Sequence, residues 1–239
     1  MSDFSTLDTE LETPLSQGGG TFCGVSEQQF AINGHTYQWP RGSKLTWGIA
    51  FSSLGGLSDM EVKDAVTSAL KEISECCDVR HEYVVNANAA NLKLTAQRLD
   101  GQSMVLADFQ IPVGNVSQDA TQLLGRFDDS ENWVLDESPP HGSIDFYRVV
   151  LHELEHGHGL GHKPASLQVP ALIAPIYSPV VRHLQPADKS ELVRRYGDRV
   201  APPSPPVPVP GATPILFTGI VTQGPKTWKV ENVELTRVQ

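Results

Sequence analysis

One stretch of eleven residues constrains this chain more than any other. It reads HELEHGHGLGH from His152 to His162 and has the spacing HExxHxxGxxH. On a helix, residues i and i+4 share one face about 6 Å apart, so His152 and His156 can direct ring nitrogens at one ion. Gly159 tolerates a positive φ, which lets the chain turn so that His162 reaches the same ion. Three neutral imidazoles leave one position of a tetrahedral zinc open, which is typical of a catalytic site.

Glu153 follows the first histidine of this motif directly. Its carboxylate can take a proton from a metal-bound water and pass it to a leaving amine, so we expect it to be the catalytic residue. A bare HExxH also occurs by chance in helices, but that alternative does not explain the third histidine and the glycines. His158 does not fit the ligand spacing, and we expect it at the surface. We also expect that Glu153 and Glu155, both charged, are not both in the core.

Composition narrows the class of protein. The chain has 239 residues, 39% hydrophobic and 19% charged, which suits one globular catalytic domain with tails. Its formal net charge of −10 argues against nucleic acid or an anionic membrane surface as a partner. No apolar run approaches the roughly 18 residues of a membrane span, and the start lacks the pattern of an export signal. We therefore expect no membrane span, no signal peptide in this chain, and a monomer.

The chain divides into four segments by composition. Residues 1–33 form a polar, flexible, pro-like segment that includes a run of three glycines. Residues 34–199 are expected to form the metallopeptidase domain, since they contain the histidine motif. Residues 200–211 are a proline-rich linker of polyproline type, and residues 212–239 form a short β-like extension.

Local patterns predict the elements of the domain. Alternation predicts strands, and apolar spacing with capping residues predicts helices. The predicted strands are 34–51, 82–85, 91–96 and 103–110, followed in the extension by 214–222 and 227–235. The predicted helices are 58–76, 143–157 and 187–196.

Further motifs surround the histidines. LIAPIY follows them at 172–177, and RYG at 195–197 closes the third predicted helix. With these motifs, residues 21–197 resemble the matrixin family of metzincin peptidases, the matrix metalloproteinases. The resemblance implies an α+β, zincin-like catalytic domain with a twisted, mostly parallel five-stranded sheet and three helices. It implies a zinc metalloendopeptidase that cleaves internal bonds of extended polypeptides, and an extracellular location, in the extracellular matrix.

The resemblance also assigns the substrate site. Pro175 and Tyr177 are similar to the segment that walls the pocket for the first primed side chain. Substrate is expected to lie antiparallel to the edge strand at 104–110, against Leu106 and Ala107. The methionine that gives the family's turn its name is replaced here by Ile173. An isoleucine still supplies an apolar floor below the metal.

The acidic stretch FDDSENW at 127–133 is similar to a calcium-binding segment of matrixins. By this resemblance Asp128 and Glu131, with Asp100 upstream, bind calcium through oxygen ligands. The alternative is a solvated acidic turn.

The second, structural zinc of matrixins is expected to be absent. No histidine lies between His81 and His141, so the usual ligands are missing. Asp108 and Arg126 occupy the positions of two of them. We expect these opposite charges to pair across two strands in place of the metal.

The segment TFCGVSE around Cys23 is similar to a degraded form of the family's cysteine switch. The resemblance implies that the Cys23 thiolate fills the open position on the zinc and keeps the enzyme latent. The alternative is an exposed free thiol. Cys76 and Cys77 are expected to be half-buried.

Three functions stay open at this point. The first is an active matrixin-like endopeptidase. The second is a metal-binding module that is catalytically weak. The third is a structural part of a larger assembly, with residues 212–239 as the docking element.

Overall fold

The computed structural model describes residues 22–25, 37–102, 104–110, 112, 116–163, 170–178, 180–199, 215–223 and 226–235. Most of the predicted N-terminal segment and all of the proline-rich linker lie outside these ranges. The chain forms two compact units, Met1–Val200 and Ala201–Gln239. Each unit is considered by itself.

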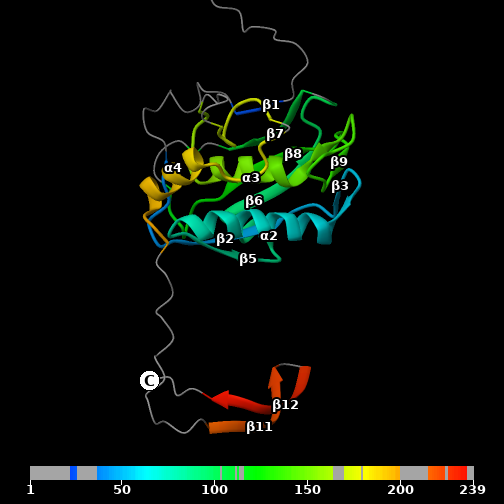
Figure 1. Ribbon diagram of the computed structural model, residues 1–239. Coiled ribbons are helices and arrows are strands. Elements are labelled where there is room, and N and C mark those ends of the chain that lie inside the picture. Colours follow the sequence, from blue (N-terminus) through cyan, green and yellow to red (C-terminus); the bar gives the residue numbers. More distant parts are fainter. Residues whose placement is uncertain are drawn as a thin grey trace, which may run out of the picture. The chain divides into compact units, whose positions relative to one another are not determined.

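The larger unit is built on one sheet (Figure 1). Its five main strands run in the order β7-β8-β6-β2-β5, and the short β1 adds a sixth strand beside β7. β2, β5, β6 and β8 are parallel, and β7 is antiparallel to β8. The bounds are β1 Phe22–Cys23, β2 Lys44–Ile49, β5 Arg80–Tyr83, β6 Leu92–Gln97, β7 Val105–Phe109 and β8 Leu123–Asp128. This is the expected five-stranded, mostly parallel α+β fold.

Within the residues that the structure describes, three helices accompany the sheet. They are α2 Asp59–Cys76, α3 Phe146–Gly157 and α4 Pro186–Tyr196. Ser58 caps α2 in a reciprocal capping box with Glu61, as the sequence predicts. Figure 1 shows α2 and α3 lying across the same face of the sheet. Their bounds agree with the predicted helices to within about three residues.

Short elements complete this unit. Two pairs of two-residue strands form small ladders, and one turn of 3-10 helix precedes β6. Their bounds are β3 Ser53–Leu54, β4 Leu57–Ser58, β9 Trp133–Val134, β10 Ile144–Asp145 and η1 Ala87–Ala89.

The strand predicted over 34–51 is shorter than expected, because only Lys44–Ile49 pairs in the sheet. Pro40 and the positive φ of Gly42 separate it from the preceding residues. Tyr37 and Trp39 alternate as in a strand but are buried against helices instead. β8 is the main strand that the sequence pattern does not reveal. It lies between β6 and β7 in the sheet, so both of its edges are hydrogen-bonded.

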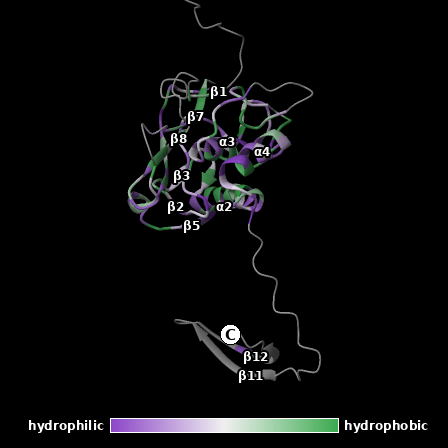
Figure 2. Ribbon diagram, turned by 90° about the vertical axis from the view of Figure 1, so that its left-hand side faces the viewer, coloured by the Kyte–Doolittle hydropathy of each residue, from purple (hydrophilic) through white to green (hydrophobic). Residues whose placement is uncertain are grey.

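The core lies between the sheet and the helices (Figure 2), where hydrophobic segments gather among the strands and helices of the larger unit. Every residue of α3 is buried. The helix is enclosed by β7 and β8 on one side and by α2 on another. The first two histidines of the motif, His152 and His156, therefore lie on the most enclosed of the described helices.

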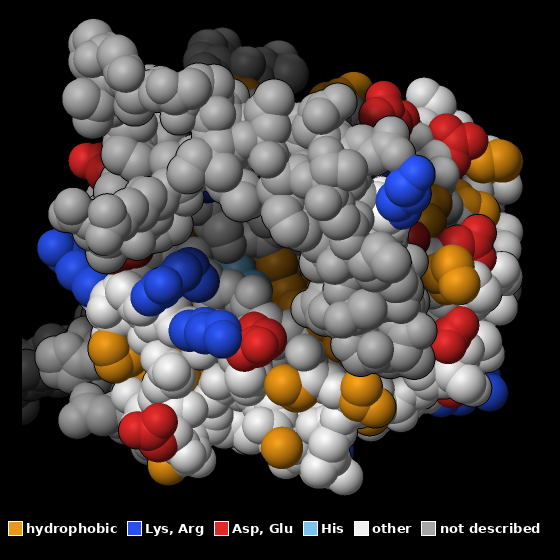
Figure 3. All heavy atoms as spheres, turned by 90° about the horizontal axis from the view of Figure 1, so that it is seen from below, with side chains coloured by type: hydrophobic (Ala, Val, Ile, Leu, Met, Phe, Trp, Pro, Cys, Tyr) orange, Lys and Arg blue, Asp and Glu red, His pale blue; other side chains and the backbone are white. Residues whose placement is uncertain are grey.

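The described side chains on the face shown in Figure 3 are mixed. Acidic, basic and hydrophobic side chains all occur there. No large patch of one charge appears among them. None of the helices in the described ranges has the length and apolarity of a membrane span.

The smaller unit contains one antiparallel hairpin. It is formed by β11 Ile215–Gln223 and β12 Lys226–Leu235. Both strands agree with the predicted ones to within a residue. The register shifts between Phe217 and Gly219, which marks a β-bulge.

Candidate active site

Helix α3 presents His152 and His156 on one face, with ring centroids 4.9 Å apart. His152 Nδ1 lies 2.7 Å from the carbonyl oxygen of Leu172, and His156 Nδ1 lies 2.8 Å from that of Leu160. Because a carbonyl only accepts, each Nδ1 carries the proton. Each Nε2 therefore offers its lone pair to the space between the rings, which is the arrangement that metal-ligating histidines adopt.

The turn after α3 brings in the third histidine. Gly159 has φ +82°, and a Cβ there would lie 2.1 Å from the carbonyl oxygen of Tyr37. Only glycine fits, for both reasons. Beyond the turn, His162 Nε2 lies 3.1 Å from His156 Nε2. The three predicted histidines are thus brought together as the spacing predicts.

Cys23 completes the cluster. Its Sγ lies 3.4 Å from His156 Nε2, and the four ligand atoms of Cys23, His152, His156 and His162 all lie within 4.8 Å of one another. Two nitrogen ligands of a tetrahedral zinc are separated by about 3.3 Å, so these separations suit that ion. His152 Nε2 is buried and has no hydrogen-bond partner, as expected of an atom that binds a metal. The donor set fits zinc.

The electrostatics of the cluster favour neutral imidazoles. Burial, together with the neighbouring His162, lowers the pKa of His152 to about 3. Burial also lowers the pKa of His162 to about 4. Neutral histidines are the form that binds a cation. Burial and the nearby Glu153 raise the pKa of the Cys23 thiol. A cation would favour the thiolate instead.

Glu153 lies beside the cluster and is fully buried. Burial raises its pKa to about 8, although contacts with Cys23 and Tyr177 oppose the rise. The Tyr177 hydroxyl donates a hydrogen bond of 2.9 Å to Glu153 Oε1. Oε2 is buried and has no hydrogen-bond partner. The carboxyl group therefore has one anchored oxygen and one available oxygen.

The structure corrects one expectation about the motif. Glu153 and Glu155 are both in the core, each with 0% exposure. The prediction assumed that both are ionised. Burial, with Asp188 nearby, raises the pKa of Glu155 well above its usual value, which favours the neutral form of its carboxyl group.

His158 is also buried, with 0% exposure, and the prediction that it lies at the surface is wrong. Its Nδ1 donates to the carbonyl of Leu154 at 2.6 Å, and its Nε2 lies 2.9 Å from Nε2 of His81. Burial lowers the pKa of His158 to about 4, so it packs as a neutral ring. No local pattern points to His81 as the partner of His158, because the two residues are 77 positions apart in the chain.

The predicted substrate edge is covered by the segment around Cys23. β1 pairs in parallel with β7. Gly24 N donates to the carbonyl of Ala107 at 2.8 Å, and Cys23 N donates to the carbonyl of Pro175 at 3.2 Å. Leu106 and Ala107 are fully buried in this arrangement. The segment therefore runs between two of the predicted substrate-binding elements.

The turn expected to lie below the metal is also in place. Ile173 is fully buried, as an apolar floor requires. The backbone N–H of the preceding Leu172 donates to Asp188 Oδ2 at 2.8 Å, while its carbonyl receives the His152 ring. Helix α4 thus holds the turn that orients a predicted ligand.

The predicted calcium segment is organised around Asp128, which is fully buried. Its Oδ2 accepts the backbone N–H groups of Leu99, Asp100 and Gly101, and its Oδ1 accepts two donors from Ser130. Asp100 accepts the Val105 N–H, and Glu131 is buried nearby in the chain. A calcium ion would have to compete with these donors.

Asp108 and Arg126 form the expected ion pair. They face each other in the register of β7 and β8. Arg126 Nε donates to Asp108 Oδ1 at 2.7 Å, and a second contact joins Nη2 to Oδ2. The pair is bidentate, which is the stronger geometry for arginine and carboxylate.

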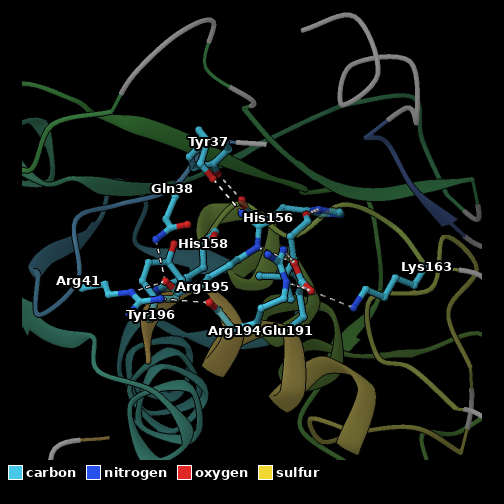
Figure 4. A network of polar contacts seen from close by, with 11 residues as sticks. Tyr37, Gln38, Arg41, His156, His158, Lys163, Glu191, Arg194, Arg195 and Tyr196 are labelled. Carbon is cyan, nitrogen blue, oxygen red and sulfur yellow. Dashed lines mark hydrogen bonds and ion pairs between the residues drawn. The ribbon is translucent and has the colours of Figure 1, made fainter. Parts of the chain in front are cut away.

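The sequence did not reveal the polar network at the end of α3 (Figure 4). The segment 37–41 and the end of α4 both reach the motif there. Figure 4 shows Tyr37 directed at the backbone of His156, and Gln38 and Arg41 directed at the last turn of α4. Buried aromatic residues that alternate at 37 and 39 were the only signal, and they favoured a strand.

Fold and histidine cluster together define a matrixin-type α+β catalytic domain. A model of the family described as Matrixin matches residues 38–197, more than half of the chain. The chain therefore belongs to the matrixin family, whose members are zinc metalloproteases. It is also similar to mouse matrix metalloproteinase-25, at 35% identity over 74 residues. That alignment covers 30% of this chain and 12% of the relative, so it concerns a small part of the relative's length.

Proposed function

We propose that this chain is a zinc-dependent endopeptidase whose metal is held by His152, His156 and His162, with Glu153 as its catalytic base. One observation carries the proposal. Three Nε2 atoms converge beside a buried carboxyl group whose Oε2 has no hydrogen-bond partner. A bound zinc would polarise the scissile carbonyl and make water acidic enough to react.

The chain's own residues handle the proton. The pKa of Glu153 needs to lie near neutral pH, so that the carboxylate can accept a proton and later release it to the leaving amine. Burial places its pKa at about 8 in the metal-free protein. Tyr177 anchors Oε1, which leaves Oε2 to exchange the proton.

We propose that the form described here is latent. The Cys23 sulfur lies among the histidine nitrogens, where it would occupy the fourth position on a zinc ion. The same segment donates backbone hydrogen bonds to the carbonyls of Ala107 and Pro175. A substrate strand would need these carbonyls as acceptors for its own backbone. Substrate would enter antiparallel to β7, so the segment around Cys23 has to leave first. The first primed side chain would then lie beside Pro175 and Tyr177.

Metal content and peptide cleavage, measured together, test this function. The wild-type chain, after displacement of Cys23 by a thiol-modifying mercurial, should hold one zinc ion and cleave a casein or gelatin substrate. Glu153→Gln should keep the zinc and lose about 10²-fold to 10⁴-fold of the rate. Unchanged turnover in this variant would contradict the assignment of the base. A protein that binds zinc but cleaves nothing would favour the non-catalytic module.

The remaining assignments are proposals of the same kind. We propose one zinc per chain, with the Asp108–Arg126 pair in place of a second; two zinc ions in metal analysis would contradict this. Calcium at Asp100, Asp128 and Glu131 is tested by a rise in the melting temperature on adding calcium. Because matrixins usually act outside the cell, we propose an extracellular location for this chain. We also propose that the enzyme is a monomer. Its proposed segments are 1–33, 34–199, 200–211 and 212–239.

A further inference from the structure

Three consecutive carbonyl groups at the end of α3 each accept a hydrogen bond from an aromatic side chain. The Tyr37 hydroxyl donates to His156 O, and Trp39 Nε1 donates to Gly157 O at 2.8 Å. The Tyr196 hydroxyl donates to His158 O at 2.6 Å. We call Tyr37, Trp39 and Tyr196 the aromatic brace.

The brace supplies hydrogen-bond donors to the buried carbonyl groups at the C-terminal end of α3. The last carbonyls of a helix lack the partner that a following turn would supply, and here the residues that carry them are buried. The His156 carbonyl also accepts the Gly159 N–H at 2.8 Å, so Tyr37 is its second donor. Burial without a partner costs about 1–3 kcal/mol for each group. Tyr37 and Trp39 come from the segment before β2, while Tyr196 comes from the last turn of α4. The end of α3 is therefore held from two sides by distant parts of the chain.

The brace also fixes the turn to the third histidine. The Tyr37 carbonyl abuts Gly159, and the Arg195 guanidinium donates to that carbonyl at 3.2 Å. The same turn places the Leu160 carbonyl, which receives the His156 ring at 2.8 Å. One tyrosine thus touches the backbone of one predicted ligand and the glycine that leads to another.

A second set of contacts makes the brace rigid. Gln38 and Arg41 donate to the carbonyl of Arg195 at 2.7 and 3.0 Å. Arg195 Nε in turn donates to Glu191 at 2.9 Å. Figure 4 shows these groups converging from the segment 37–41 and from α4. The segment and the helix act as one support behind the histidines.

We infer that the aromatic brace is a positioning device that sets the zinc affinity of the site by fixing the backbone between His156 and His162. The inference rests on the proposed function, because it needs zinc at these histidines. Groups that orient metal ligands typically contribute about 10-fold to 100-fold in affinity. The tyrosines of the brace do not touch the reacting atoms.

Two single-atom variants of the full chain test the inference. Tyr37→Phe and Tyr196→Phe each remove one hydroxyl group and keep the ring. Tyr147→Phe is the matched control, because its hydroxyl donates to Glu72 Oε2 at 2.8 Å near the other end of the same helix. Zinc affinity is measured by competition with a chelator, and the free energy of unfolding is measured on the metal-free proteins.

We expect each brace variant to bind zinc about 10-fold more weakly than the wild type, and the control to bind it equally well. A purely structural role would lower the stability of the metal-free protein in all three variants and leave zinc affinity unchanged. That result would overturn the inference and leave the proposed function standing. A wild-type protein without affinity for zinc would overturn both.

Discussion

The hydroxyl group of Tyr177 lies 2.9 Å from Glu153 Oε1. The two residues come from different parts of the fold, since Glu153 is on α3 and Tyr177 follows the turn at Ile173. The Tyr177 ring also lies against His152, with centroids 5.0 Å apart. A residue that resemblance assigns to the wall of a substrate pocket therefore also contacts the proposed base.

Tyr177→Phe should lower kcat about 10-fold to 100-fold with little change in KM. The ring proposed to wall the pocket remains, and the variant removes only the hydrogen bond to Glu153. Such a bond is worth about 1.5–3 kcal/mol when the carboxyl group is ionised, as a base must be before it accepts a proton. Steady-state kinetics on a peptide substrate check this. Tyr147→Phe loses a tyrosine–glutamate hydrogen bond of 2.8 Å outside the site and should keep its kcat. Equal kinetics in the two variants would contradict the anchoring role.

Cys23→Ser should make the full-length chain active without any displacing reagent. Serine keeps the shape of the segment but replaces the soft sulfur ligand, so zinc loses its intramolecular competitor to substrate. Because a tethered group acts at an effective concentration of about millimolar, we expect a rise in kcat/KM of about 10-fold or more.

Cys76→Ser serves as the control for that variant, since Cys76 is half-buried at the end of α2 and lies outside the cluster. Its activity should match the wild type. Equal basal activity of Cys23→Ser and the wild type would show that the sulfur does not restrain the enzyme.

Gly159→Ala should destabilise the protein by at least about 2 kcal/mol and weaken zinc binding. The new Cβ would lie 2.1 Å from the Tyr37 carbonyl oxygen, at a φ of +82° that suits glycine. Gly142→Ala separates these two effects, because its φ is +81° and nothing lies within 4 Å of the added atom. That control should lose only about 1–2 kcal/mol and keep its zinc. Urea unfolding and zinc competition measure both quantities.

Glu191 should stabilise the protein in a pH-dependent way. The hydrogen bond from Arg194 is the largest of the effects that lower the pKa of Glu191 to about 2. Burial opposes this shift, and the charges of Arg195 and Lys163 add to it. A lowered folded-state pKa gives stability that is present above the unfolded pKa near 4.3 and is lost as the pH falls toward 2. Urea unfolding should therefore show Glu191→Gln less stable than the wild type at pH 7, with the difference shrinking below pH 4.

Glu75→Gln is the comparison for that measurement. Glu75 pairs with Lys71 at 3.7 Å, and both side chains are more than half exposed. Exposed pairs contribute little to stability, so this variant should follow the wild type at every pH. A difference between Glu191→Gln and the wild type that is constant with pH would contradict the role of its charge.

Local rules predicted much of the fold from the sequence. The capping box at Ser58, the helical spacing of the histidines and the glycine at 197 each depend on neighbours in the chain, and their helices appear where expected. The pairing of Asp108 with Arg126 was also predictable, because opposite charges replaced two residues of the family's pattern.

Burial was less predictable, since it depends on what covers a residue. His158 and Glu155 resemble surface residues in the sequence, but α3 is enclosed on every side in the structure. The residues that interact with them come from other elements. His81 contacts the His158 ring, and Asp188, together with burial, raises the pKa of Glu155.

The sequence by itself determined which residues can bind a metal, because the HExxHxxGxxH spacing and a glycine's freedom in φ are properties of the local chain. Tertiary structure alone decided what holds those residues in place. Tyr37, Trp39, Tyr177 and Tyr196 reach the site across about 20 to 120 positions, as the separations of their hydrogen-bonded partners show. Spacing cannot encode such contacts, because they form only when the sheet and helices pack and bring distant segments to the same helix end.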